Sequence, residues 1–401
     1  MNIGEYMDKG VIYELKDKYT LHWNYRGLSK LPVEILYHGG HVQEMYLKCN
    51  DLKQLPVWLD KLGSLRHLYL HGNRISELPK SIGGMLSLTT LDLQNNCLCD
   101  LTPSIGDLKH LKVLNLQYNY IKNLPKEIRK LRSLLLLNLK GNQLHEICEE
   151  VCSLNSLREL ILDENKISAL PNNIVYMSNL SYLSLDGNQL KYLPMVKFLN
   201  KPMLSIANNK YLNYVSYDLG CSMTSHSTML VNCDLWHFNC AGCCKENVDI
   251  SCGNTLEIPS FNTRIALPPM LKKVYDENTR FIPSLYELAL RIGYSLYFCI
   301  HDLRECLCIE DIEDIPSELA TMFSSGPVAS CQYCSGPIFT EAVLWVFPRY
   351  LLHLKPEWPE FFLAVMCFCT QNCSLKFIEN EIFIKEYNER MNVELIKWSI
   401  G

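Results

Sequence analysis

The sequence lacks the features that mark nucleic-acid-binding and membrane proteins. Its 401 residues carry a formal net charge of -5 and no run of lysine or arginine. Phosphate binding needs a basic surface, so a nucleic acid is a poor candidate for the main partner. No uninterrupted apolar stretch is long enough to span a bilayer, and the opening MNIGEYMDKGVIYELKDK has charges where a signal peptide needs an apolar core. We therefore predict an intracellular protein with no membrane span. Its predicted location is the cytoplasm, and the nucleus is the alternative.

The common catalytic signatures are missing as well. The chain has no G-x-x-x-x-G-K-[ST] phosphate loop, no G-x-S-x-G nucleophile elbow and no H-E-x-x-H metal helix. Nothing pairs a cysteine with a histidine in a way that is typical of a thiol enzyme. We predict that the protein is not an enzyme.

The sequence does contain one motif, L-x-L-x-x-N-x-L-x-x-L-P, which repeats through its first half. The repeated asparagines fall 23 residues apart at Asn50, Asn73, Asn96, Asn119, Asn142, Asn165 and Asn188. The leucines and isoleucines of one repeat can leave water only by stacking on those of the next. This pattern is typical of leucine-rich repeats and predicts an α/β solenoid of about nine turns over residues 16–219, with a single parallel sheet. We expect the asparagines to form a buried, structural hydrogen-bond ladder.

Residues that alternate with the buried leucines should line the concave face of this horseshoe. The candidate protein-binding residues are Tyr46, Lys48, Arg66, His67, Tyr69, His71, Asp92, Gln94, Asn115, Tyr118, Asn138, Glu159, Ile161, Asp163, Tyr182 and Asp186. Basic and aromatic side chains gather in the early repeats and acidic ones in the late repeats, which suits a protein partner. The alternative for any single position is a solvated strand residue. We interpret His67 and His71 as surface histidines, because no third metal ligand has a convincing spacing.

Cysteine marks a second module. Of the 19 cysteines, 14 fall between Cys221 and Cys373, and in a reducing compartment such a cluster binds metal more often than it forms disulfides. A C-x2-C pair at Cys331 and Cys334 and a C-x3-C pair at Cys369 and Cys373 supply the four thiolates that a structural, tetrahedral zinc requires. The alternative is a set of buried free cysteines, and the neighbouring Cys367 is a spare thiol. We predict a cysteine-rich zinc-binding module over residues 220–401.

The second cysteine pair opens a run with helical spacing. The motif resembles the zinc fingers that end F-C-S-x-x-C-x-x-x-F, with Thr370 in place of their serine. That resemblance implies a treble-clef-like finger over about residues 328–380. A second knuckle, Cys240 and Cys243 with His237 before it, lacks a visible partner pair, and a second zinc site there is left open. Four cysteines close the coordination shell, so any zinc should be structural and not catalytic.

Several motifs together carry a family resemblance. They are LHWNYRGLSKLPVEIL near the start, the 23-residue array, NNKYL at its end, and C-Q-Y-C-S-G-P-I-F-T with C-T-Q-N-C in the tail. The chain resembles the animal leucine-rich repeat-containing protein 28 family over nearly its whole length. It departs from that family in the insertion at residues 221–239 and in the tail after Phe377. The resemblance implies a non-enzymatic interaction protein, and we predict a scaffold whose zinc module is a structural cap or a second binding platform.

A run with helical spacing lies between the two cysteine clusters at residues 283–293. It loosely resembles the box by which ubiquitin-ligase substrate receptors dock on Elongin C, with Ala289 in place of the usual cysteine. Residues 315–323 look like the Pro-containing segment that selects a cullin. The docking residues would be Ser284, Leu285, Leu288 and Ala289, in a helix-in-groove contact. This resemblance gives an alternative function, the substrate receptor of a cullin-RING ubiquitin ligase. The competing interpretation is an amphipathic helix that packs on the zinc module.

Overall fold

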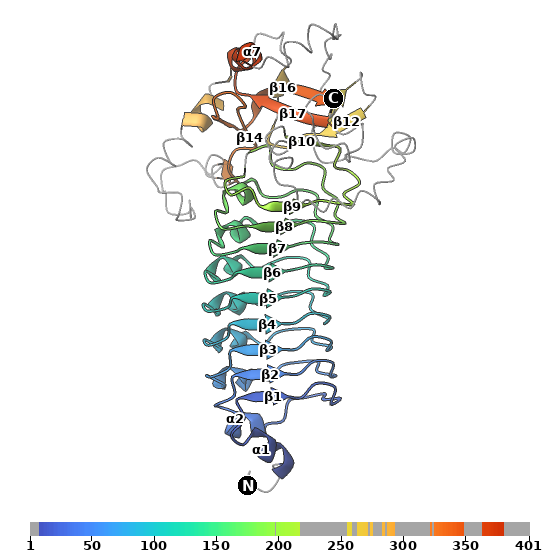
Figure 1. Ribbon diagram of the computed structural model, residues 1–401, viewed down its shortest axis with the longest axis vertical. Coiled ribbons are helices and arrows are strands. Elements are labelled where there is room, and N and C mark those ends of the chain that lie inside the picture. The colour runs from blue at the N-terminus through green and yellow to red at the C-terminus, as the bar shows by residue number, and fades with distance from the viewer. Residues whose placement is uncertain are drawn as a thin grey trace. The chain divides into compact units, whose positions relative to one another are not determined.

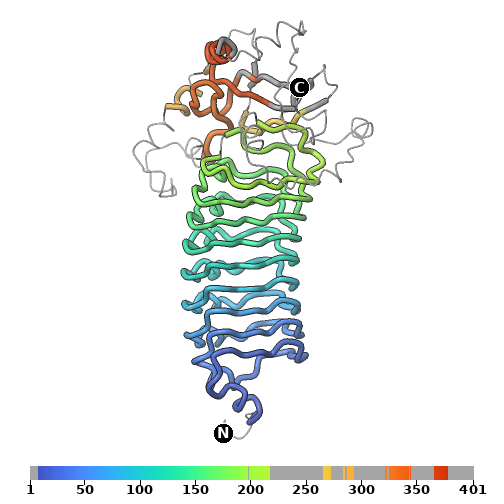
Figure 2. The backbone as a smooth tube through the Cα atoms, viewed as in Figure 1, coloured from blue at the N-terminus to red at the C-terminus, as the bar shows by residue number. Residues whose placement is uncertain are grey.

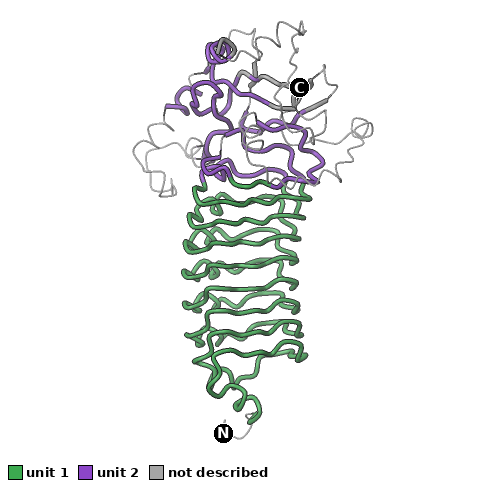
Figure 3. Tube along the Cα trace, viewed as in Figure 1, with its two compact units in different colours: residues 1–167, 177–188, 202–204 green, residues 168–176, 189–201, 205–401 purple. Residues whose placement is uncertain are grey.

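The computed structural model describes residues 8–196, 198–216, 255–258, 263–271, 273–275, 283–284, 287–292, 321–322, 325–348 and 363–380. The chain divides into two compact units (Figure 3). The first comprises Met1–Ile167, Met177–Asn188 and Pro202–Leu204, and the second comprises Ser168–Tyr176, Gln189–Lys201 and Ser205–Gly401. The predicted boundary between residues 219 and 220 stays a prediction.

A nine-stranded parallel sheet runs through the repeats, with its strands in chain order. Figure 1 labels these strands, and Figure 2 shows the backbone of the repeats stacked one on the next. Its strands are β1 (Thr20–His22), β2 (Glu44–Tyr46), β3 (His67–Tyr69), β4 (Thr90–Asp92), β5 (Val113–Asn115), β6 (Leu136–Asn138), β7 (Glu159–Ile161), β8 (Tyr182–Ser184) and β9 (Met203–Ser205). The register keeps equivalent residues opposite one another, as with Leu68, Leu91 and Leu114. The predicted solenoid of about nine turns is confirmed.

Each central leucine of these strands is buried against its neighbours. Leu91, Leu114 and Leu137 are all 0% exposed, and each such side chain contributes about 1.5 to 3 kcal/mol through its removal from water. The flanking residues of β2 to β6 are half-buried, so each of these strands has one core-facing residue between two partly exposed ones. The solenoid therefore presents a continuous, partly exposed row on its sheet face.

The return path of six repeats is a short 3₁₀ helix. These helices are η2 (Val57–Lys61), η3 (Lys80–Gly84), η4 (Pro103–Asp107), η5 (Lys126–Lys130), η6 (Glu149–Ser153) and η7 (Asn172–Tyr176). The L-P-x-x-I pattern explains them, because Pro79 precedes η3 in an extended conformation and the isoleucine of the same helix, Ile82, is fully buried. Proline cannot donate a backbone hydrogen bond, so it suits the start of so short a helix.

The repeated asparagines form the predicted ladder. Asn119 accepts a hydrogen bond from the Leu98 amide at 3.0 Å and donates to the Leu93 and Leu116 carbonyls, each at 3.0 Å. Asn142 bonds in the same way to groups one repeat further along. The seven side chains are only 4–7% exposed, so these bonds satisfy polar groups that water does not reach.

The N-terminal end of the array is covered by two helices, α1 (Lys9–Leu15) and α2 (Glu34–His38). Leu15 and Ile35 are fully buried, and Trp23 is 2% exposed. The Glu14 carboxylate accepts hydrogen bonds from the Trp23 indole at 2.6 Å and from Arg26 at 2.8 Å. Since terminal repeats have no neighbour to cover their core, this arrangement caps the solenoid.

The described residues of the second unit form a four-stranded sheet and two small ones. The large sheet has the order β10 (Tyr214–Ser216), β17 (Leu363–Phe368), β16 (Glu341–Pro348) and β13 (Lys273–Tyr275). The two-stranded sheets pair β11 (Thr255–Ile258) with β12 (Thr263–Ala266), and β14 (Ala329–Ser330) with β15 (Pro337–Ile338). Helix α7 (Gln371–Asn380) follows β17. Among the described residues, no helix has both the length and the apolar character needed to cross a membrane.

Candidate metal centre and binding face

The four predicted cysteine ligands lie on three neighbouring elements of the second unit. Cys331 follows β14, and its amide donates to the Gly336 carbonyl at 2.8 Å while its carbonyl accepts from the Ser335 amide at 2.8 Å. Ser335 has a positive φ of 58°, which closes this tight turn with Cys334 inside it. Cys369 comes directly after β17, and Cys373 lies in the first turn of α7. A knuckle, a hairpin and a helix thus bring the two pairs together.

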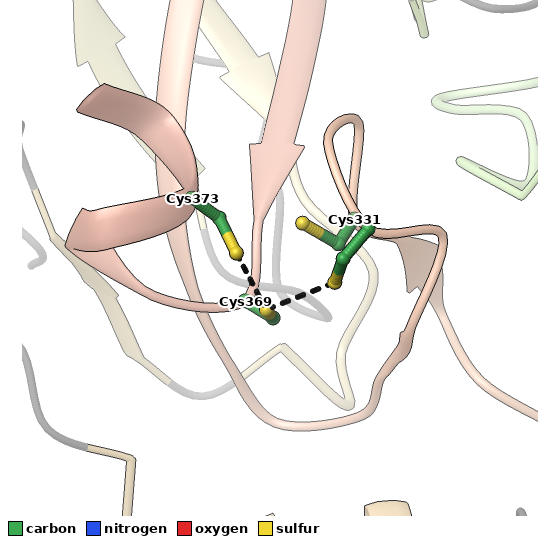
Figure 4. Close-up of side chains that lie close together, drawn as sticks. Cys331, Cys369 and Cys373 are labelled. Atoms are coloured by element: carbon green, nitrogen blue, oxygen red, sulfur yellow. Dashed lines mark hydrogen bonds between the residues drawn. The ribbon is translucent and has the colours of Figure 1, made fainter. Parts of the chain in front are cut away.

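The four sulfur atoms lie within 4.8 Å of one another. The Cys369 sulfur is 3.5 Å from that of Cys334 and 3.5 Å from that of Cys373, and Figure 4 shows the side chains of Cys331, Cys369 and Cys373 converging. All four are free thiols, and these distances are too long for a disulfide bond. A tetrahedral ion with metal–sulfur bonds of about 2.3 Å would separate its sulfurs by about 3.8 Å. The cluster could therefore hold a metal ion after small adjustments.

Electrostatics at the cluster also favour a cation. The Cys369 thiol donates a hydrogen bond to the Cys331 sulfur, and this bond, opposed by burial, lowers the pKa of Cys331 to about 4. The same bond raises the pKa of Cys369 far above its ordinary value. Four adjacent thiolates would repel one another unless a cation lay among them. An ion held by all four sulfurs would have no coordination position left for a substrate.

The spare thiol, Cys367, lies in the core of the second unit. It is 4% exposed, and its thiol donates to the Met195 sulfur at 3.6 Å. Phe368 and Phe377 belong to the same core cluster, and their ring centroids are 5.4 Å apart. Cys367 lies inside β17, whereas Cys369 lies just beyond the end of that strand and Cys373 lies in α7. Cys240 and Cys243, the second predicted pair, lie outside the described residues.

A short helix at residues 287–292 also belongs to the second unit. Glu287 and Leu290 are fully buried, whereas Leu288 is 36% exposed and Ala289 is exposed. Ser284 is half-buried and its hydroxyl accepts from the Glu287 amide at 3.2 Å. The predicted docking anchor Leu285 lies outside the described residues, as do residues 315–320. The described part of this segment packs on the module that carries the cysteines.

Sequence reasoning missed Glu287 and Arg291 of this helix. The Arg291 side chain forms an ion pair with Glu287 at 2.7 Å, and the two side chains are 12% and 0% exposed. An E-x-x-x-R spacing is common on solvated helix faces. The one available signal was that this pair stands among apolar residues in a helical pattern.

The predicted concave-face residues all lie on or beside β2–β8, and none of them is buried. In the early repeats three rings form one stack: His22 lies over Tyr46 at 4.9 Å between centroids, and Tyr46 over Tyr69 at 4.6 Å. The Lys48 ammonium lies 5.1 Å from the Tyr69 ring centroid, within cation–π range. His22 was not predicted, because the first repeat is irregular in sequence.

Further along the sheet the character of this face changes. Side-chain amides pair across β4 to β6, as Asn115 donates to Gln94 at 3.2 Å and Asn138 to Gln117 at 3.1 Å. The late repeats are acidic. There Asp163 accepts the Asp186 amide at 3.0 Å, and the side chain of Glu159 is exposed. The Nδ1 atom of His71 lies 3.7 Å from an Asp92 carboxylate oxygen. This carboxylate is a neighbour of the histidine, so its position needs no metal ion to explain it.

Comparisons with known proteins concern the repeats. Three family models match: a leucine-rich repeat region at residues 100–201, two copies of leucine-rich repeats at residues 63–106, and a leucine-rich repeat at residues 19–75. No curated protein matches the sequence.

Three of the solved structures with similar chains come from two bacteria and a plant. A leucine-rich repeat protein of Leptospira interrogans is 27% identical, with a TM-score of 0.44, over 54% of this chain and 67% of that one. The repeat ectodomain of the Arabidopsis thaliana receptor kinase GASSHO1/SCHENGEN3 is 24% identical, with a TM-score of 0.43, over 48% and 24%. Internalin C2 of Listeria monocytogenes is 27% identical, with a TM-score of 0.40, over 45% and 76%.

Proposed function

We propose that this leucine-rich repeat protein is a cytoplasmic, non-enzymatic scaffold that binds a protein partner on its concave face. Its cysteine module serves as a structural cap or a second platform. The motifs at its two ends further support membership of the animal leucine-rich repeat-containing protein 28 family. The zinc-finger motif and the order of knuckle, hairpin and helix support a treble-clef-like finger at about residues 328–380.

The observation that carries the binding function is the unbroken row of partly exposed side chains on the adjacent strands β2 to β7. The constant register holds the backbone of these residues at a fixed spacing, so little backbone entropy is lost when a partner binds. Aromatic groups at one end and carboxylates at the other give the row a direction. A protein surface with complementary anchors would bind in one orientation.

Zinc is the metal that the cysteine cluster fits best. Tetrahedral thiolate sites in proteins are typical of zinc and of iron–sulfur centres, and the pairing of a knuckle with a helix is typical of structural zinc. In this cluster Cys331, Cys334, Cys369 and Cys373 would be the ligands. When bound, the ion would neutralise their charge and hold the hairpin to the helix.

Exchanging charges on the concave face tests the binding function. Arg66→Glu together with Glu159→Arg changes two exposed side chains, one directly before β3 and one at the first residue of β7, and leaves the net charge as it was. We expect the melting temperature to stay within about 2 °C, because surface changes alter stability little, while partners recovered from cells by affinity purification are lost. Asp163 is left unchanged because it accepts hydrogen bonds from Ser184 and Asp186.

The matched control is Lys109→Glu with Glu146→Arg, a second exchange of exposed charges placed outside the strands. This variant should recover the same partners as the unaltered protein. If the concave-face variant keeps every partner, the concave face is not the binding surface. Recovery of Elongin C and a cullin by the unaltered protein would instead favour the ligase-receptor function.

A further inference from the structure

We infer that the Glu287–Arg291 pair positions both cysteine pairs for metal binding, which makes the helix at residues 287–292 a third part of the metal site. This inference rests on the proposed zinc site. It follows from the hydrogen bonds that the two side chains make to the two loops carrying the cysteines.

Glu287 fixes the loop that follows the first cysteine pair. Its carboxylate is fully buried and accepts the Phe339 amide at 3.0 Å, the Thr340 amide at 2.7 Å and the Thr340 hydroxyl at 2.8 Å. These residues join β15 to β16, directly after the knuckle. A buried carboxylate is stable only when such donors and a cation surround it. The loop is therefore held by a charge-assisted network and not by apolar contact alone.

Arg291 fixes the loop that carries the second pair. Its guanidinium donates to the Cys369 carbonyl at 2.9 Å and to the Glu341 carbonyl at 3.1 Å, while its Nε donates to Glu287 at 2.7 Å. The planar group has several donors in a fixed geometry, so it can hold these acceptors at once. One of them is the backbone of a predicted ligand, which orients the Cys369 side chain toward the cluster.

In the sequence the two loops are separated by the whole β16–β17 hairpin. One side-chain pair nevertheless holds both loops. Groups of this kind around a metal keep its ligands in the binding geometry, and their loss typically weakens metal affinity about 10- to 100-fold. Because the coupling is reciprocal, bound metal should also hold the helix in place. The face of the helix that bears Glu287 and Leu290 would then be covered whenever zinc is bound.

The test measures zinc affinity by competition with a chromogenic chelator, using the full chain. Arg291→Met keeps the length of the side chain and removes its donors, and we expect about 10- to 100-fold weaker zinc binding. Arg291→Lys keeps the positive charge but has fewer hydrogen-bond donors. The zinc affinity of this variant should therefore lie between those of Arg291→Met and the unaltered protein. Arg26→Met is the matched control, because Arg26 also pairs with a glutamate at 2.8 Å but lies in the N-terminal cap. Its zinc affinity should not change.

Hydrogen exchange gives a second readout. Amides of residues 287–292 should exchange faster when zinc is removed, whereas those of β3 to β6 should not change. Should Arg291→Met fail to fold, Arg291→Lys decides, and an affinity equal to that of the unaltered protein overturns the inference. If the unaltered protein binds no zinc, the proposed metal site itself fails, and the two failures are thus distinguishable.

Discussion

A column of left-handed residues lies beside the asparagine ladder. In each repeat the residue before the ladder asparagine has a positive φ: Cys49, Gly72, Asn95, Tyr118, Gly141, Glu164 and Gly187. Three of the larger side chains lie over a glycine of the next repeat, Cys49 over Gly72, Tyr118 over Gly141 and Glu164 over Gly187. The glycines therefore serve two purposes, since they tolerate the left-handed conformation and leave room for the side chain of the preceding repeat.

Gly141→Ala should destabilise the array by about 2 to 5 kcal/mol. The added Cβ would meet the Tyr118 ring, and the alanine would also be strained at a φ of 68°. Conformational strain of this kind costs about 1 to 2 kcal/mol and overpacking about 1 to 3 kcal/mol. Urea unfolding would measure the loss.

Tyr118→Gly separates the two contributions. With the ring removed, adding Gly141→Ala should cost only the conformational part, about 1 to 2 kcal/mol. An equal cost with and without the Tyr118 ring would show that the ring does not confine this glycine.

How much could be predicted at this scale depends on the range of the contacts. The asparagine ladder and its burial were both predictable, because the 23-residue repeat is visible in the sequence itself. The Glu287–Arg291 pair depends on backbone groups at least 50 residues away, such as the Thr340 amide, which is 53 residues from Glu287. No local pattern indicates that such a pair is buried. The prediction for this helix therefore did not include Glu287 and Arg291.

At the scale of elements, the cysteine pairs were predictable because their spacing reflects metal geometry. The knuckle needs a tight turn and the second pair needs the start of a helix, and both C-x2-C and C-x3-C carry that information. The strands β10 and β13, which flank this hairpin in the same sheet, were not predicted. Each is three residues long, too short for alternation to be visible in the sequence.

We expect the purified protein to contain about one zinc ion per chain at this module. Cys334→Ser should release that zinc and make residues 328–380 sensitive to protease, because the metal contributes directly to folding. The control is Cys99→Ser, which changes an exposed cysteine of the repeats and should keep the zinc. Elemental analysis with limited proteolysis would check both variants, and a protein purified without chelator that holds much less than one equivalent would contradict the site.

At the scale of the whole molecule, the second unit takes in part of the repeats. It includes Gln189–Lys201 and residues from Ser205 onward. Met195 and Tyr214, 2% and 0% exposed, share one core cluster with Val365 and Phe368 of β17, and β10 pairs with β17 in parallel. Composition marked residue 219 as the boundary because cysteine becomes frequent there. Composition cannot show which earlier apolar residues pack with which later strands.

A fragment of residues 1–219 therefore tests the predicted domain boundary. It keeps β10 and Met195 but loses β16 and β17, so it would expose apolar side chains that the full chain buries. We expect residues 189–216 of the fragment to lose hydrogen-exchange protection by about 100-fold or more, as residues that have lost their packing partners do. The strands β2 to β6 should keep theirs, because each still lies between two neighbouring repeats. The full chain measured in parallel is the control. A monomeric fragment whose residues 189–216 are protected as they are in the full chain would place the boundary at residue 219 after all.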